Sequence, residues 1–158
     1  MLPTDWSQVK RIYEEGIASG HATFEREAPT WTAWDASHLK ACRWVATQGD
    51  RVLGWTALSP TSSRCVYRGV TEVSVYIGCD YRGNGVGRAL LKKVIESSEQ
   101  EGIWTIHSGI FPENKASVAL HQSLGFRQVG YFERIGKMED KWRDTIYLER
   151  RSQVVGIN

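Results

Sequence analysis

The chain has little of what marks secreted, metal-binding or membrane proteins. Its three cysteines, Cys42, Cys65 and Cys79, are odd in number and form no Cys-x-x-Cys pair, which argues against a disulfide framework and a structural zinc site. No two of its four histidines stand at ligand spacing, so we expect no metal. It has no apolar run of membrane-spanning length, and its first residues lack the apolar stretch of a signal peptide. We therefore expect a cytoplasmic protein with no membrane partner.

An excess of charge of one sign is also missing. The 20 Lys and Arg residues against 18 Asp and Glu give a net charge of +2, without a long positive run. This argues against a nucleic-acid partner. A length of 158 residues with 41% hydrophobic residues suits one domain over residues 1–158. Aromatic residues are plentiful, and we expect packing to explain most of the seven tryptophans, with some lining a binding surface.

The most informative segment is a glycine-rich turn between a predicted strand at 70–78 and a predicted helix at 85–100. Glycines at 83, 85 and 87 let backbone N–H groups approach a ligand closely. The helix N-terminus adds unpaired N–H groups and the positive end of its dipole. Arg82 and Arg88 add positive charge. Such a turn binds phosphate or pyrophosphate, so we predict a nucleotide-like anion as the ligand.

The glycine pattern narrows this ligand. The chain contains no P-loop sequence, and Gly83-x-Gly85-x-Gly87 lacks the dinucleotide spacing and lies past the midpoint. Arg82-x-x-Gly85-x-Gly87 resembles instead the pyrophosphate motif of the GCN5-related N-acetyltransferases, which hold acetyl-coenzyme A. The alternative is an ordinary strand-to-helix turn. The resemblance implies that the turn binds acetyl-CoA through Arg82, Gly83, Asn84, Gly85, Val86, Gly87 and Arg88.

Periodicity and turn residues predict the remaining elements. We expect helices from a cap at Thr4 or Asp5 to Ala18, at 32–41 and at 114–124, and strands at 42–47, 52–58, 103–110, 126–135 and 144–149. Early hairpins followed by alternating strands and helices indicate an α/β domain with a mixed sheet. The tail from 151 to 158 is expected to be loose.

Three further blocks match the acetyltransferase family in order and spacing: 112–126, 136–144, and Phe24-Glu25. Together they resemble the branch with phosphinothricin and methionine sulfoximine acetyltransferases. The resemblance implies a mostly antiparallel sheet flanked by helices and splayed between the family's fourth and fifth strands, and a homodimer. The family's short opening strand is missing or rudimentary, since only Met1 to Pro3 is available.

The resemblance also assigns residues to the coenzyme. The pantetheine arm of acetyl-CoA threads through the splay, past the backbone of Val75, Tyr76 and Ile77. A backbone N–H of this stretch is placed to stabilise the developing oxyanion. Asn114 and Ser117 are expected to contact the same arm.

Glu72 and His121 are the predicted catalytic residues. An ammonium must lose a proton before it attacks a thioester, and Glu72 is the candidate base, directly or through water. Strand alternation places Glu72, Ser74 and Tyr76 on one face and Val73 on the other. His121 stands where many family members carry tyrosine, and could relay the amine's proton or protonate the thiolate. The alternatives are that Glu72 caps a strand end and that His121 is structural.

The predicted substrate residues are Phe24, Arg64, Tyr67, Ser74 and Tyr76. Arg64 can grip a carboxylate with two parallel hydrogen bonds, although a solvated loop arginine is the alternative. Ser62 replaces a lysine associated with phosphinothricin, which weakens that compound as the substrate.

We predict an acetyl-CoA-dependent N-acetyltransferase for a small amino-acid-like amine of the phosphinothricin, methionine sulfoximine or methionine sulfone type. Acetylation of a peptide or protein amine, and a non-catalytic coenzyme A-binding module, are the alternatives.

Overall fold

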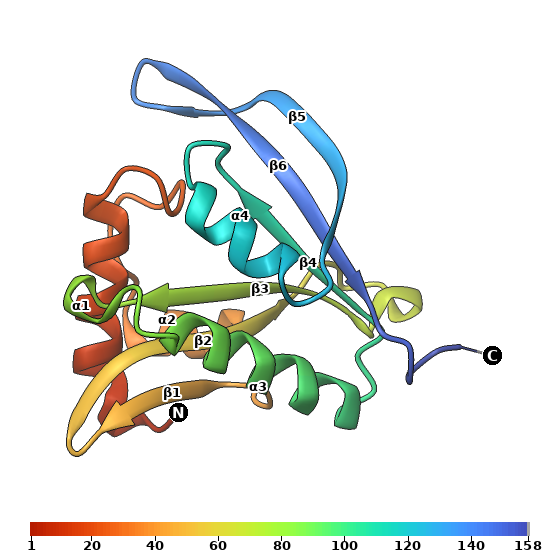
Figure 1. Cartoon of the computed structure of the whole chain (residues 1–158), viewed down its shortest axis with the longest axis horizontal. Helices are drawn as coiled ribbons and strands as arrows, with labels where there is room; N and C mark the ends of the chain where they lie inside the picture. The colour runs from red at the N-terminus through yellow and green to blue at the C-terminus, as the bar shows by residue number, and fades with distance from the viewer. Residues whose placement is uncertain (158) are drawn as a thin grey trace.

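A six-stranded sheet forms the centre of the protein in the computed structural model, which describes residues 1–157 (Figure 1). Its strands are β1 (Trp44–Gln48), β2 (Arg51–Pro60), β3 (Val70–Ile77), β4 (Thr105–Ile110), β5 (Arg127–Met138) and β6 (Lys141–Arg151), in the order β1-β2-β3-β4-β6-β5. Every neighbouring pair is antiparallel except β3 and β4, which are parallel. This arrangement confirms the predicted mixed, mostly antiparallel sheet.

Helices cover both faces of the sheet (Figure 1). Helices α1 (Trp6–Ala18) and α2 (Trp31–Ser37) pack on one face, and α3 (Val86–Gln100) and α4 (Lys115–Gln122) on the other. The α3 side buries an aliphatic core that includes Leu58, Leu91 and Leu148. The α1 side is richer in aromatic rings and is centred on Trp34 and Trp55. Burial on both faces makes β2 a central, well-anchored strand.

Strand β3 keeps one neighbour along its whole length and the other for only three residues. Its pairing with β2 runs from Thr71 to Ile77. Its pairing with β4 covers Val70 to Glu72 alone, and the two strands then diverge, as Figure 1 shows. This is the splay that the family resemblance implies. It lies between the third and fourth strands of this chain, because residues 1–5 form a 3₁₀ turn at Pro3–Asp5 and no strand.

A stack of aromatic rings fixes the side of β3 that faces α1. Tyr76 stacks on Trp55 at 4.8 Å between ring centroids, and Tyr13 of α1 meets Tyr76 edge-on, also at 4.8 Å. Gly16 makes this possible, since a Cβ there would lie 2.7 Å from the Tyr76 ring. A glycine costs a helix stability, but this one lets α1 approach β3 closely.

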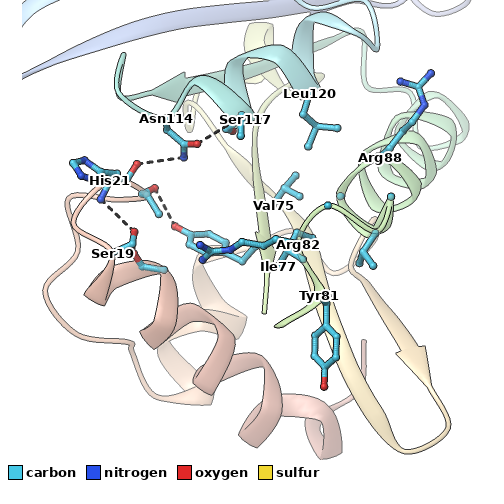
Figure 2. Close-up of a pocket in the computed structure, with 18 of the residues that line it drawn as sticks. Ser19, His21, Val75, Ile77, Tyr81, Arg82, Arg88, Asn114, Ser117 and Leu120 are labelled. Carbon is cyan, nitrogen blue, oxygen red and sulfur yellow. Dashed lines mark hydrogen bonds between the residues drawn. The ribbon is translucent and has the colours of Figure 1, made fainter. Parts of the chain in front are cut away.

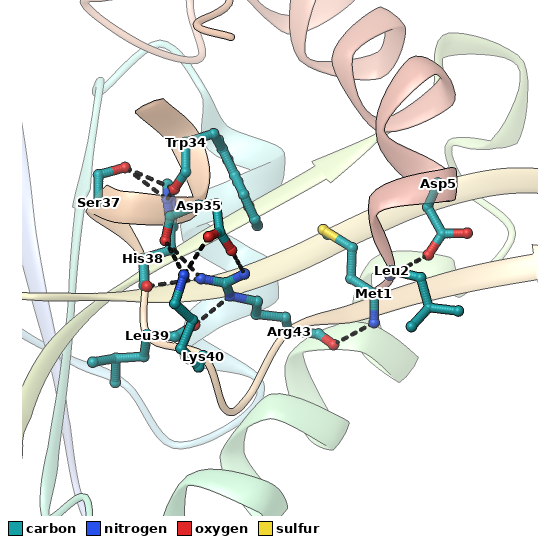
Figure 3. Close-up of polar contacts among 10 residues, drawn as sticks. All are labelled: Met1, Leu2, Asp5, Trp34, Asp35, Ser37, His38, Leu39, Lys40 and Arg43. Atoms are coloured by element: carbon teal, nitrogen blue, oxygen red, sulfur yellow. Dashed lines mark hydrogen bonds and ion pairs between the residues drawn. The ribbon is translucent and has the colours of Figure 1, made fainter. Parts of the chain in front are cut away.

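A buried arginine ties α2 to the start of β1 (Figure 3). The Arg43 guanidinium donates to the Asp35 carboxylate at 2.5 Å and to the backbone carbonyls of Asp35, Leu39 and His38, and it lies over the Trp34 ring. Arg43 and Lys40 lower the pKa of the Asp35 carboxyl. These acceptors satisfy the charge of Arg43, which would otherwise be costly to bury.

Two predicted strand boundaries are wrong for local reasons, and the predicted cap residue Asp5 holds its position without a capping hydrogen bond. Asp5 stands at the α1 N-cap, yet its carboxylate accepts from Leu2 N at 2.7 Å and caps nothing in α1. Strand β1 begins only at Trp44, after Cys42 adopts a left-handed φ of 59°. The predicted last strand at 144–149 is longer, because β6 pairs with β5 from Lys141 onward.

The described part of the tail is also anchored where we expected it to be loose. Arg151 belongs to β6, and its guanidinium donates to the carbonyls of Trp104 and Val155. Ser152 is buried. Its backbone N–H donates to Trp104 O, and its hydroxyl donates to the Glu99 carboxylate. The sequence did not predict this anchoring, because it depends on polar residues that leave no hydrophobic pattern in the tail.

Trp55 should contribute strongly to stability, because it is 1% exposed and stacks on Tyr76. We expect Trp55→Ala to lower the free energy of unfolding by about 3–5 kcal/mol, the usual cost of deleting a buried tryptophan. Urea unfolding monitored by circular dichroism measures this change. Trp142→Ala is the matched control, since Trp142 is 54% exposed and should change stability by less than about 1 kcal/mol. Equal losses in the two variants would contradict the role given to the aromatic stack.

Candidate active site

The turn after β3 has the conformation that only glycine adopts easily. Gly83 and Gly85 have φ values of +76° and +78°, and Gly85 is the N-cap of α3. Nothing lies within 4 Å of a Cβ built on either residue. Glycine at these two positions therefore serves the backbone conformation and not close packing. This conformation turns the first N–H groups of α3 outward. At Gly87 a Cβ would lie 3.1 Å from Leu120, so this glycine lets α3 and α4 pack closely.

These N–H groups border a cavity of about 530 Å³, here called the loop cavity (Figure 2). It is lined by Gly16, Ser19, His21, Ala22, Val75, Tyr76, Ile77, Tyr81, Arg82, Gly83, Gly85, Val86, Gly87, Arg88, Glu113, Asn114, Ala116, Ser117 and Leu120. Arg82 and Arg88 bring positive charge to the helix N-terminus. The loop cavity therefore suits a phosphate-bearing ligand with an apolar arm. Of the predicted loop residues, Asn84 alone is outside the lining, because it sits exposed at the tip of the turn.

A second cavity of about 500 Å³, the strand-gap cavity, opens between β3 and β4. Glu72, Ser74, His121, Phe24 and Tyr147 are among its lining residues. The two cavities share His21, Ala22, Val75, Tyr76, Asn114 and Ser117. Ligands bound in the two cavities would therefore meet where β3 leaves β4.

The backbone of β3 presents donors at this meeting point. Gly78 N donates to Leu53 O, and Val70 O accepts from Thr61 N, so the even-numbered residues bond toward β2. Successive residues of a strand direct their N–H groups to opposite sides. The N–H groups of Val75 and Ile77 thus point toward β4, beyond the last paired residue, Glu72. These are backbone donors without a sheet partner, as an oxyanion site requires.

The loop between α1 and α2 covers the junction of the two cavities (Figure 2). Asn114 donates its amide to His21 O at 3.3 Å, and the Tyr76 hydroxyl donates to Ala22 O at 3.5 Å. Arg143 of β6 holds the same loop from outside: its guanidinium donates to Gly20 O at 2.9 Å and to His21 Nδ1 at 3.3 Å. Burial raises the pKa of Tyr76, so its hydroxyl remains a donor. Side chains from three separate elements thus fix the α1–α2 loop, which forms the roof over the two cavities.

His121 is buried at the base of the strand-gap cavity, on α4. Its Nδ1 lies 2.8 Å from Ser117 O, which can only accept, so Nδ1 carries the proton. Burial lowers the pKa of His121, which favours the neutral ring. In that form Nε2 has a free lone pair, and it is buried without a hydrogen-bond partner among the described residues. The ring is therefore set to accept a proton at Nε2.

Glu72 is exposed to the strand-gap cavity, at the last paired position of β3. Its carboxylate lies beside Gly109 of β4, where a Cβ would be in ordinary van der Waals contact with Glu72 Oε1 at 3.7 Å. Tyr76 packs against the α1-side core and Val73 and Val75 belong to the α3-side core, so the predicted alternation of β3 is confirmed.

The predicted substrate residues separate into two groups. Phe24 lines the strand-gap cavity and meets Phe111 edge-on at 4.7 Å; it also packs so close to Gly136 that any side chain there would clash. Arg64 and Tyr67 line neither cavity. Both are exposed in the loop before β3, where the Arg64 guanidinium lies over the Tyr67 ring. The structure of this chain does not bring them to the site.

Several lining residues were missed from the sequence: Ser108, Gly109, Ile110, Phe111, Phe132, Ile135, Thr145 and Tyr147. They come from β4, β5 and β6, on the far side of the strand gap. Alternation along β6 separates Thr145, Tyr147 and Glu149 from the core residue Leu148, so the sequence could have predicted this face of the strand. The sequence could not have predicted that the face lies near Glu72, because that depends on the pairing of β6 with β4.

The sequence profile of the acetyltransferase (GNAT) family matches residues 6–126. The chain belongs to this family. It is 33% identical over 153 residues to the phosphinothricin N-acetyltransferase of Alcaligenes faecalis, with 92% of this chain and 77% of the relative covered. It is 33% identical over 98 residues to the L-methionine sulfoximine/L-methionine sulfone acetyltransferase of Pseudomonas aeruginosa, with 62% of this chain and 57% of the relative covered.

A solved GNAT structure shows the same fold over the whole chain. The phosphinothricin acetyltransferase from Sinorhizobium meliloti, in complex with AcCoA, superposes with a TM-score of 0.90 and 27% identity, covering 100% of this chain and 89% of that one. In residues 1–157 of this GNAT chain, no three His, Cys, Asp or Glu side chains gather as metal ligands would. None of the helices described is both long and apolar enough to cross a membrane.

The buried histidine predicts how the stability of this GNAT chain depends on pH. The pKa of His121 is lowered in the folded state, so below about pH 6.5 the unfolded chain binds a proton that the folded chain does not. Stability should therefore fall as the pH drops through this range, with a contribution of up to about 1.4 kcal/mol per pH unit from this group. Urea unfolding at pH 7.5, 6.5 and 5.5 should show a flatter dependence in His121→Leu.

The pKa of His38 is lowered in the same direction by burial, so part of the slope should remain in that variant. Leu124→Ala serves as the control. It removes packing against the core without changing a titratable group, and should lower stability equally at every pH. An unchanged slope in His121→Leu would contradict the assignment of a buried neutral ring.

Proposed function

We propose that this protein is an acetyl-CoA-dependent N-acetyltransferase that acts on the amino group of a small amino-acid-like molecule. The observation that carries the proposal is the meeting of two cavities at the strand gap. One has the phosphate-binding turn, and the other has Glu72 and His121. A binding module for the coenzyme alone would need only the first cavity.

The loop cavity fits the coenzyme. The α3 N-terminus, Arg82 and Arg88 would hold its pyrophosphate, and Asn114, Ser117 and Leu120 would flank its arm. When bound, acetyl-CoA supplies an activated acetyl thioester. The N–H groups of Val75 and Ile77 stand where the thioester carbonyl must lie if its arm passes through the gap, and they would stabilise negative charge on that oxygen.

Glu72 would act as the base for the incoming amine. An amine at neutral pH arrives mainly as an ammonium, whose nitrogen has no free electron pair. The Glu72 carboxylate lines the strand-gap cavity together with the α1–α2 loop and the diverging strands β3 and β4. It can therefore take that proton directly or through one water. Its exposure lets it release the proton to solvent afterwards.

His121 would act as a proton relay. Its Nε2 is unprotonated in the neutral ring, so it must first accept a proton before it can donate one. It can take the second proton of the amine nitrogen at Nε2 and return it to the leaving sulfur as the thiol forms. The sequence suggested two separate roles for His121, as a relay for the amine's proton or as the acid for the thiolate. The unprotonated Nε2 joins them into one sequence, in which His121 first accepts a proton and then donates it.

The cavity walls support a compact acceptor with an apolar portion. Phe24, Phe111, Phe132 and Ile135 supply apolar surface beside the carboxylate of Glu72. The phosphinothricin and methionine sulfoximine/sulfone acetyltransferases named above act on molecules of this size. We therefore propose an amino acid of that type as the acceptor.

A thiol-release assay over amino acids and short peptides tests the function. We expect turnover with methionine sulfone or methionine sulfoximine, and about a 100-fold or greater loss of kcat in Glu72→Gln, the usual contribution of a general base. Glu96→Gln, an exposed change on α3, is the control and should keep full activity. Preference for peptides would favour a peptide or protein acetyltransferase. Tight acetyl-CoA binding without thiol release from any amine would favour a binding module.

We further propose a cytoplasmic homodimer. The support is β5, an edge strand of the sheet that carries exposed Val129, Tyr131, Phe132 and Ile135. Edge strands with apolar surface are sites of association.

Sedimentation equilibrium should give twice the 17.9 kDa mass of the chain at micromolar concentration. Val129→Lys should shift the mass toward the monomer, while Val154→Lys, a change at a more exposed valine in the tail, should not. A monomer at every concentration would refute the dimer.

A further inference from the structure

A row of alternating acidic and basic side chains crosses four strands on the Glu72 side of the sheet. Glu72 of β3 stands opposite His107 of β4, His107 opposite Glu149 of β6, and Glu149 opposite Arg127 of β5. The mechanism above uses only the first of these residues. The other three form a polar chain whose inner end lies beside the strand-gap cavity.

Tyr147 connects this chain to the cavity. Arg127 pairs with Glu149 at 2.7 Å, His107 Nε2 lies 3.5 Å from the other Glu149 oxygen, and the Tyr147 hydroxyl lies 3.2 Å from His107 Nδ1. Tyr147 also lines the strand-gap cavity, where it meets Phe132 edge-on at 5.4 Å. His107 does not line that cavity, so Tyr147 is the part of the chain that a ligand would touch.

The contacts set the direction in which the Tyr147 hydroxyl points. Glu149 Oε2 lies 3.5 Å from Nε2 and can only accept, which favours the tautomer of a neutral His107 ring that has its proton on Nε2 and leaves Nδ1 as an acceptor. Burial and the carboxylates of Glu72 and Glu149 raise the pKa of Tyr147, so it keeps its proton and donates it to Nδ1. The lone pairs of the Tyr147 oxygen are then left for a donor in the cavity.

Gly109 brings no side chain of its own to the space beside Glu72, Thr145 and Tyr147. A Cβ built on it would be 3.7 Å from Glu72 Oε1 and 3.9 Å from Tyr147 Cδ2. Glu72 and Tyr147 both line the strand-gap cavity, and the Glu72 carboxylate is near enough to the Tyr147 hydroxyl to raise its pKa, so two hydrogen-bond acceptors border the same cavity. An amino group, which carries several N–H donors, is the chemical group that such a pair suits.

We propose that Tyr147 is a substrate-binding residue that accepts a hydrogen bond from the acceptor's amino group while Glu72 takes its proton. His107 and Glu149 are positioning residues, which hold the Tyr147 hydroxyl in the accepting orientation. This proposal rests on the proposed function and adds to it the second group that orients the amine for attack.

Tyr147→Phe removes the oxygen and keeps the ring that packs on Phe132. With methionine sulfone, or the best acceptor of the amino-acid panel, we expect KM for the amine to rise about three- to tenfold, the worth of one hydrogen bond. KM for acetyl-CoA should not change. Unchanged amine kinetics in an active Tyr147→Phe enzyme would overturn this proposal alone, whereas a wild-type enzyme that releases no thiol would overturn the proposed function and this proposal together.

Variants of His107 separate positioning from a general structural effect. Asparagine keeps an acceptor near the position of Nδ1 and leucine does not, so His107→Leu should reproduce the rise in amine KM and His107→Asn should largely restore it. In the Tyr147→Phe background, His107→Leu should have no further effect on KM. An additive effect there would show that His107 acts without Tyr147.

The tautomer of His107 gives a readout independent of turnover. Nitrogen-15 NMR of the histidine rings should show the proton of neutral His107 on Nε2 in the wild type. A proton on Nδ1 would reverse the hydroxyl and overturn the proposal.

Discussion

The loss of pairing between β3 and β4 after Glu72 is the constraint on which the site depends. A strand with one open side leaves N–H and carbonyl groups without partners, which costs stability unless another group satisfies them. In this fold the open side lies between the two cavities, so the unpaired donors of Val75 and Ile77 stand where the ligands meet. The same separation gives Glu72 and Tyr147 access to one cavity.

The gap has walls fixed by contacts that are distant in sequence. The α1–α2 loop closes it above through hydrogen bonds from Asn114, Tyr76 and Arg143. Tyr76 is itself held by Trp55 and Tyr13. The aromatic side of the sheet thus positions the residue at the centre of the site, and stability and function share one set of contacts. A weakened stack would loosen the roof as well as the core.

Local sequence was sufficient where local physics decides the structure. The glycine turn was predictable because its conformation and its helix N-terminus lie within a few residues, and the faces of β3 followed from alternation. Long-range pairing decides the rest. Tyr147 reaches the site only because β6 pairs with β4. Arg64 lies outside it because its loop turns at Cys65–Tyr67, where its guanidinium packs on Tyr67. No local pattern carries either fact.

The two cavities differ in charge, and this difference sorts their ligands. The loop cavity combines Arg82, Arg88 and the α3 N-terminus with one carboxylate, Glu113. The strand-gap cavity has the carboxylates Glu25 and Glu72 and no lysine or arginine among its described lining residues. An anionic coenzyme is favoured on the first side and an ammonium on the second. The carboxylates that attract the ammonium include the base that must discharge it. Binding therefore delivers the amine in the charged form, and attack becomes possible only after Glu72 has taken the proton beside the thioester.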